Sequence, residues 1–279
     1  MLSLQQCEQF QRDGFLVLPD FKGDEEIASL RERAAGIVAA FDASQHASIF
    51  TTSDQARKVD DYFMNSASQI QCFFEEEAFD ARGALKQDKC LSINKIGHAM
   101  HDLDPVFGGF SRGPKLAALA RDIGLRRPQI WQSMYIFKQP GIGGEVGWHQ
   151  DATFFDTTPT SVTTFWFALE DATRANGCLW AQPGAHRSPL RERFVKSGTG
   201  AAMQKLDATP WPSTETAVAL EVKAGALIVF HGLLPHYSAP NRSAQSRHAY
   251  TLHATDGHSV YSPYNWLQRG PNLPARGFD

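Results

Sequence analysis

The chain has 279 residues, of which 42% are hydrophobic and 20% charged, and its formal net charge is −3. This composition is typical of a globular protein that can fill a large interior, and a single β-rich core commonly reaches this length. We therefore expect one domain over residues 1–279. No stretch concentrates Lys and Arg as the neutralisation of phosphates requires, which argues against a nucleic-acid-binding protein.

The cysteines and the N-terminal residues suggest a reducing compartment. The four cysteines are widely spaced, form no CxxC pair and follow no secretory leader. No apolar run approaches the roughly 20 residues that cross a bilayer. We therefore expect a cytoplasmic protein that binds a small-molecule substrate, and neither a membrane nor nucleic acid. Its oligomeric state is left open.

The first part of the chain contains a short strand and two amphipathic helices. Residues 14–18 have the apolar character of a strand, and the acidic residues 24–26 then favour a helix start. A second helix is expected over residues 114–123, with Pro114 in its first turn and Gly124 beyond its end. The apolar stripe of each helix is assigned to the core.

From residue 128 the pattern changes to short β-branched and aromatic runs separated by Gly, Pro and Asn. A helical first third followed by many short strands predicts a mainly β fold with flanking helices, a jelly roll with its helices on one face. Two stretches are expected to be surface loops or lids, residues 195–215 and 44–61. The expected strands are 129–138, 160–170, 177–182, 217–222, 226–231 and 247–255.

The most informative motif is the segment Trp148-His149-Gln150-Asp151. A His and a carboxylate two positions apart on a strand point to the same side and can meet one metal ion. His236, just past the predicted strand 226–231, is the candidate third ligand. Two His and one carboxylate on one face leave octahedral positions open, which is the arrangement of Fe(II) oxygenases.

A cation downstream strengthens this interpretation. Arg247 follows His236 by eleven residues and begins a strand-like run. Its guanidinium can bind the distal carboxylate of 2-oxoglutarate as a bidentate pair while the keto-acid end chelates iron. The rival ligand is His231, which Gly232 follows as in a packed strand end. The rival cation is Arg242, which lies in an apparent turn and is expected to be solvated.

The remaining histidines have a plainer interpretation. Because His is of intermediate burial in proteins, each is expected to be structural or to face solvent rather than to bind metal. They are His46, His98, His101, His186, His231, His248, His253 and His258.

With these residues placed, the sequence resembles the phytanoyl-CoA dioxygenase (PhyH) family of 2-oxoglutarate oxygenases, and most of all its phytanoyl-CoA dioxygenase domain-containing members. The resemblance covers most of the chain and follows the family's order. It is carried by the HQD segment together with residues 93–99, 132–140, 176–180 and 262–267. It implies a double-stranded β-helix, cupin-like in architecture, with iron at its open end.

The resemblance also implies five contacts to 2-oxoglutarate. Lys95, Met134, Trp166, Ser238 and Arg247 match the positions of the family's cosubstrate-binding residues. Each has a plainer alternative except Arg247, which the spacing suggests independently. Met134 and Trp166 would otherwise be core residues, Lys95 a solvated charge and Ser238 a turn hydroxyl.

The implied activity couples oxidative decarboxylation of 2-oxoglutarate to C–H hydroxylation of a small molecule, an acyl-CoA or a carboxylic acid. His149, Asp151 and His236 would be the catalytic metal centre, with Fe(II), 2-oxoglutarate and O2 as reactants and ascorbate supporting turnover. Related halogenases carry Gly or Ala where this chain has Asp151, so hydroxylation is favoured over halogenation.

Three other functions are compatible with parts of this pattern. A Zn(II) hydrolase could use the same three ligands with a water, although the spacing to Arg247 argues against it. A non-catalytic member could bind metal and 2-oxoglutarate as a sensor or scaffold, since a fold does not establish a function. A cupin-type seed protein or isomerase is the third alternative. Residues 183–186 resemble a cupin fragment, but the first motif lacks its second His.

Overall fold

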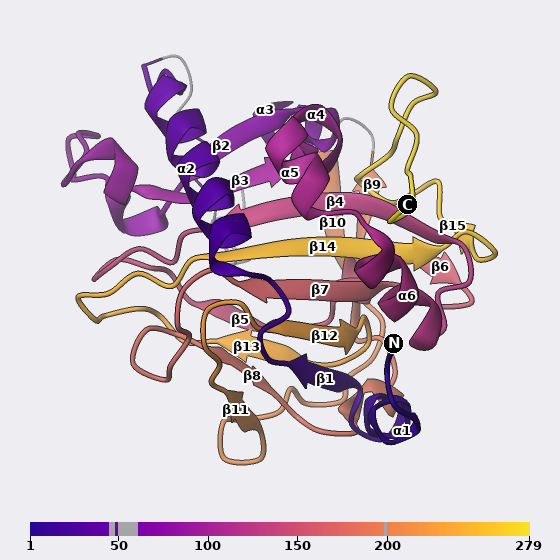
Figure 1. Ribbon diagram of the computed structural model, residues 1–279. Helices are drawn as coiled ribbons and strands as arrows, with labels where there is room; N and C mark the ends of the chain where they lie inside the picture. Colours follow the sequence, from indigo (N-terminus) through magenta and orange to yellow (C-terminus); the bar gives the residue numbers. More distant parts are fainter. Residues whose placement is uncertain (45–47, 50–60, 198–199) are drawn as a thin grey trace.

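A computed structural model describes residues 1–44, 48–49, 61–197 and 200–279 (Figure 1). Two antiparallel sheets form its centre, one of seven strands and one of four. The larger has the order β1 (Phe15–Leu18), β12 (Leu227–His231), β7 (Thr163–Ala168), β14 (Ala249–Asp256), β4 (Pro128–Ile136), β3 (Ile93–His98), β2 (Ile70–Phe74). The smaller has the order β11 (Val218–Leu220), β8 (Leu179–Ala181), β13 (His236–Ser238), β5 (Val146–His149). The jelly roll is therefore confirmed, with all six expected strands present.

Helices cover the outer face of the larger sheet, as Figure 1 shows for α2, α5 and α6. In α2 the apolar residues recur every three or four positions, so that Ile27, Leu30, Ala34 and Val38 are buried against the sheet. The helices are α1 (Leu4–Asp13), α2 (Asp24–Ala40), α3 (Asp61–Asn65), α4 (Met100–Leu103), α5 (Pro105–Phe110) and α6 (Pro114–Asp122). Both expected helices, α2 and α6, are confirmed.

A second core lies between the two sheets. Trp166 and Phe230 of the larger sheet pack in one cluster with Leu179 and Leu220 of the smaller sheet. Side chains on alternate positions of β7 and β12 thus point away from the helices and toward the smaller sheet. This inner layer is the one that the predicted metal ligands face.

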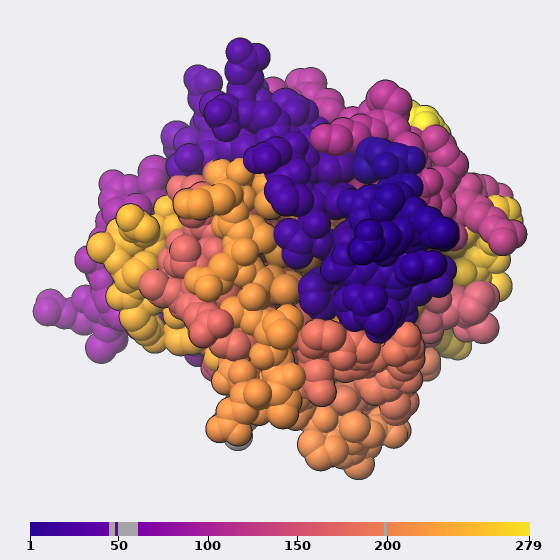
Figure 2. All heavy atoms as spheres, turned by 60° about the horizontal axis from the view of Figure 1, so that its bottom comes forward, coloured from indigo at the N-terminus to yellow at the C-terminus, as the bar shows by residue number. Residues whose placement is uncertain are grey.

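The N-terminal segment completes the edge of the larger sheet. Strand β1 pairs with β12 from Phe15↔Phe230 to Leu18↔Leu227, and Figure 2 shows the indigo N-terminal residues lying against the second half of the chain. Helix α1 was not predicted. Its capping box, formed by Ser3 and Gln6, is present, but the helix is short and mostly polar, and Phe10 is its one buried residue.

One predicted loop is partly wrong. Residues 195–215 include most of a two-stranded hairpin, β9 (Glu192–Ser197) and β10 (Gly200–Lys205). Phe194 is only 2% exposed and packs in a third cluster with Phe155 and Trp266, so the contact that anchors the hairpin comes from a residue just before the predicted loop. Residues 206–215 are irregular, as expected. The other predicted lid, residues 44–61, lies mostly outside the described residues. A second short pair joins β6 (Thr157–Thr158) and β15 (Val260–Tyr261).

Among the residues described, no helix has the length and apolar character that spanning a membrane requires.

Leu30 provides a test of the packing between α2 and the larger sheet. Its side chain is fully buried, and replacing a buried Leu with Ala leaves a cavity, so Leu30→Ala should lower the free energy of unfolding by about 2–5 kcal/mol. Leu103→Ala is the matched control, because Leu103 is 46% exposed and its loss should cost below about 1 kcal/mol. Urea unfolding of both variants measures this, and equal costs would contradict the packing described.

Candidate metal and cosubstrate site

The smaller sheet brings the three predicted metal ligands together. His149 ends β5 and His236 begins β13, and the two residues are cross-strand partners. The sequence pattern predicts that Asp151 lies on the same strand as His149. In the structure the strand ends at His149, and a short 3-10 helix (Asp151–Thr153) begins at Asp151. The carboxylate nevertheless turns back toward both rings.

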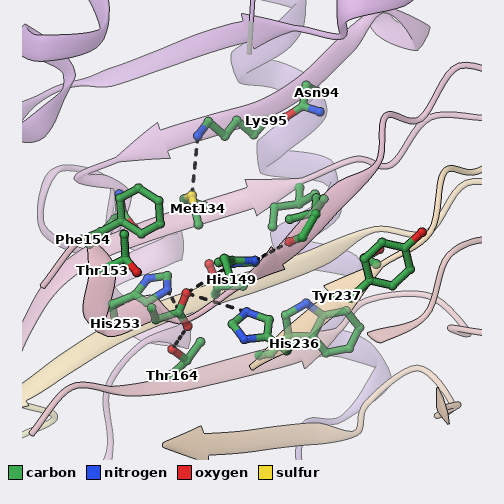
Figure 3. A pocket seen from close by; sticks show the side chains of 18 of the residues that line it. Asn94, Lys95, Met134, His149, Thr153, Phe154, Thr164, His236, Tyr237 and His253 are labelled. Atoms are coloured by element: carbon green, nitrogen blue, oxygen red, sulfur yellow. Dashed lines mark hydrogen bonds and ion pairs between the residues drawn. The ribbon is translucent and has the colours of Figure 1, made fainter. Parts of the chain in front are cut away.

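The geometry of this triad fits a metal ion. One ligand atom from each of His149, Asp151 and His236 lies within 4.8 Å of the others. Asp151 Oδ1 is 3.6 Å from His149 Nε2 and 3.7 Å from His236 Nε2. The three ligand atoms are therefore close enough together to share one ion. Figure 3 shows both rings turned toward the interior of the same pocket.

Backbone carbonyls select the ring nitrogen that faces the metal position. His149 Nδ1 lies 2.8 Å from the carbonyl oxygen of Gly147, and His236 Nδ1 lies 3.0 Å from that of Leu234. A carbonyl oxygen only accepts hydrogen bonds, so each Nδ1 carries the proton and donates it. Each Nε2 therefore presents its lone pair, as a metal ligand requires.

The outer oxygen of Asp151 is held by two residues that the sequence analysis did not select. Thr164 donates a short hydrogen bond to Oδ2, and His253 Nε2 lies 3.4 Å from the same atom. His253 is stacked on Phe155 with ring centroids 4.9 Å apart. The sequence did contain a signal for His253. It lies an even number of positions after Arg247 in the predicted strand 247–255, so both side chains are expected on the same face. These contacts leave Oδ1 directed at the two histidine rings.

The surroundings favour the protonation states that bind metal. Desolvation, followed by the proximity of His236, lowers the pKa of His149 to about 4, so its ring is neutral near pH 7. Burial alone would raise the pKa of Asp151, but His236 and His253 more than offset it and hold this pKa well below its usual range. His149 therefore presents a neutral imidazole and Asp151 a carboxylate.

Arg247 lies in the same cavity as the triad, with an unsatisfied guanidinium. It is 1% exposed, its Nη2 donates to Ser238 Oγ at 3.3 Å, and it stands 5.3 Å from the ring centroid of Trp166. Its Nε and Nη1 have no hydrogen-bond partner within the described part of the chain. Burial lowers the pKa of Arg247 to about 10, which leaves it protonated at neutral pH. A buried cation with free donors needs an anion.

The other positions matched by the family resemblance line the same cavity. Lys95 is buried, with Nζ 3.8 Å from the sulfur of Met134 (Figure 3). Trp166 and Ser238 flank Arg247. The plainer alternative for Lys95, a solvated charge, is thus excluded, and Trp166 is both a core residue and part of the cavity wall.

The cavity has a volume of about 320 Å³ and walls of two chemical kinds. Lys138 and Arg247 both contact Ser238, whereas the ammonium of Lys95 lies 5.9 Å from the ring centroid of Phe63. The rest of the wall is mostly aromatic and apolar, and includes Phe63, Phe154, Phe194, Met203, Trp211 and Trp266. The ligand triad lines the same cavity.

The rival residues lie elsewhere. His231 accepts a hydrogen bond from the amide of Leu233 and packs beside His186, outside this cavity. Arg242 is exposed and pairs with Glu77 at 2.6 Å. His186, the histidine of the cupin-like fragment, therefore does not join the triad either.

Comparison with known proteins agrees with the resemblance seen in the sequence. Residues 10–249 match the family model described as phytanoyl-CoA dioxygenase (PhyH). The chain is 47% identical over 271 residues to a phytanoyl-CoA dioxygenase of Arabidopsis thaliana, covering 96% of this chain and 94% of that protein. It is 43% identical over 282 residues to phytanoyl-CoA dioxygenase domain-containing protein 1 of Mus musculus, covering 98% and 97%.

Solved structures share the fold. The chain superposes on the epimerase SnoN in complex with Fe3+, alpha ketoglutarate and nogalamycin RO with a TM-score of 0.64 and 16% identity, covering 99% of this chain and 94% of that one. This likeness confirms the double-stranded β-helix. The family match and the triad together support the prediction of a 2-oxoglutarate-dependent dioxygenase.

Thr164 provides a test of how Asp151 is held. Thr164→Val removes the hydroxyl that donates to Oδ2, and the loss of such an outer contact typically weakens metal affinity about 10–100-fold. Calorimetric titration of the metal-free protein with Fe(II) under anaerobic conditions measures this. Thr163→Val is the matched control, because the adjacent residue on β7 faces the opposite side. Equal affinities for both variants would contradict this role.

Proposed function

Because the chain belongs to the phytanoyl-CoA dioxygenase family, we propose that it is an Fe(II)- and 2-oxoglutarate-dependent dioxygenase that hydroxylates a C–H bond of a small molecule. One observation carries the proposal. A triad of two His and one Asp shares a cavity with a buried arginine whose Nε and Nη1 lack partners among the described residues. A zinc hydrolase has no use for the second feature, whereas a dicarboxylic cosubstrate requires it.

In this proposal His149, Asp151 and His236 hold the iron, and Arg247 with Ser238 receives the distal carboxylate of 2-oxoglutarate. Lys95, Met134 and Trp166 line the path between them. When bound, iron supplies the reaction of O2 with 2-oxoglutarate and substrate that yields succinate, CO2 and the hydroxylated product.

The chain's own contribution is orientation and exclusion of water. Backbone carbonyls fix the two imidazole rings, while Thr164 and His253 fix the carboxylate. The aromatic wall suits an apolar part of the substrate and keeps water from the reacting centre. We propose an acyl-CoA or a carboxylic acid as the substrate class, which fits that wall.

The proposed activity predicts metal-dependent succinate formation. The purified protein with Fe(II), ascorbate and O2 should convert 2-oxoglutarate to succinate, faster when a true substrate is added from a panel of acyl-CoAs, free carboxylic acids and amino acids. Zinc should not support the reaction, and His149→Ala should abolish it by removing a metal ligand. Succinate in neither the parent nor the variant would favour a sensor or scaffold.

Arg247 provides a second test, of the cosubstrate anchor. Arg247→Ala should raise the KM for 2-oxoglutarate at least about tenfold, since a charge-assisted hydrogen bond contributes on the order of 1.5–3 kcal/mol. Arg242→Ala is the matched control, because its exposed guanidinium pairs with Glu77 at the surface. Thermal unfolding shows whether each variant is folded. An unchanged KM in folded Arg247→Ala would reject this anchor.

A further inference from the structure

A second buried cation lies beside Arg247. Lys138 is 2% exposed and lines the cavity. Its Nζ donates to the carbonyl oxygen of Gly144 at 2.6 Å and lies 3.4 Å from the carbonyl oxygen of Ser238. Ser238 also accepts from Arg247 through its hydroxyl. The Lys138 amine and the Arg247 guanidinium therefore contact the same residue of β13, the first at its carbonyl oxygen and the second at its hydroxyl.

The backbone holds Lys138 in this place at a conformational cost. Its φ is +43°, a left-handed conformation that non-glycine residues seldom adopt. Its carbonyl oxygen accepts from Asn241 Nδ2 at 2.9 Å and from the amide of Arg247 at 3.3 Å. The side chain passes close to Gly177, where an added Cβ would lie 2.7 Å from Lys138 Cε. The surrounding structure thus fixes both backbone and side chain.

Glu75 provides a counter-charge. It is 1% exposed, and its Oε2 accepts from Asn94 Nδ2 at 2.8 Å and from the amide of Gly144 at 3.1 Å. Gly144 is therefore held on both sides, its amide by Glu75 and its carbonyl by Lys138. An added Cβ at Gly144 would lie 3.2 Å from Glu75 Oε2. This clamp lies just before β5, which carries His149.

The balance of charge in this cluster leaves room for one anion. Lys138 and Arg247 are the two basic groups, and Glu75 is the acidic group that acts to raise the pKa of both. Burial, followed by Arg247, lowers the pKa of Lys138 well below its usual range. A further carboxylate in the cavity would favour the protonated form of Lys138 and satisfy the unpartnered Nε and Nη1 of Arg247.

We propose that Lys138 is a specificity-determining residue that, together with Arg247, binds the distal carboxylate of the 2-oxo acid and so selects a dicarboxylic cosubstrate. The inference rests on the proposed function. In this proposal Glu75 is the counter-charge of Lys138 in the free protein, and the incoming carboxylate is the counter-charge of Arg247. The contacts to Gly144 keep the Lys138 side chain at a fixed place relative to β5, which carries the metal ligand His149.

The test compares two ligands that differ only in the second carboxylate. Lys138→Gln should weaken binding of 2-oxoglutarate to the anaerobic Fe(II) protein about tenfold, while binding of 2-oxopentanoate, which lacks that carboxylate, should stay unchanged. A purely structural role would weaken both ligands alike, and that result would overturn the inference. Lys223→Gln is the matched control, because Lys223 is exposed and pairs with Asp171 at the surface.

A double variant separates loss of binding from misfolding, because Lys138→Gln alone leaves the buried carboxylate of Glu75 without its nearby basic group. Glu75→Gln combined with Lys138→Gln keeps the local charge constant and should restore the thermal stability, yet binding of 2-oxoglutarate should remain weak. Recovery of wild-type 2-oxoglutarate affinity in the double variant would show that Lys138 serves only as the counter-charge of Glu75, and would overturn the inference. Since binding is measured without turnover, a parent that binds 2-oxoglutarate but forms no succinate refutes the proposed function alone.

Discussion

The buried carboxylate of Asp151 is the constraint around which the rest of the site is arranged. An ionised carboxylate inside a protein is costly unless charges and hydrogen bonds compensate it. Here Thr164 and His253 contact one oxygen, and His149 and His236 face the other. Both sheets are needed for this, because Thr164 and His253 belong to the larger sheet and the two facing histidines to the smaller. The packing of the two sheets thus sets the distances at the metal position.

Strand β13 links the metal position to the cosubstrate anchor. His236 and Ser238 are two residues apart on this strand and so point to the same side. The first faces Asp151 and the second contacts Arg247. The separation between the metal position and the Arg247 guanidinium is therefore fixed largely by the rise per residue of β13. A shift of register by one residue would turn the side chains of His236 and Ser238 away from the cavity together.

Much of this arrangement could be predicted from the sequence, for reasons that particular residues make clear. The strands and two amphipathic helices follow from local periodicity, and the HQD segment with His236 and Arg247 follows from spacing and family resemblance. The contacts of Thr164 and Glu75 could not be predicted, because they depend on which strands become neighbours, and strand parity places His253 on the correct face without showing that it contacts Asp151. Strand β14 lies between β7 and β4, an order that no local pattern states. Helix α1 and the β9–β10 hairpin were missed because each buries few apolar residues.

The cavity combines two basic groups, Lys138 and Arg247, with a mostly aromatic wall. A charge in a medium of low dielectric holds a carboxylate strongly and disfavours an uncharged group. The aromatic wall, where the ring centroids of Phe154 and Phe194 are 5.7 Å apart, favours apolar surface and disfavours charge. Under the proposed function, the carboxylate of the cosubstrate and an apolar part of the substrate would therefore bind to different parts of the same cavity wall.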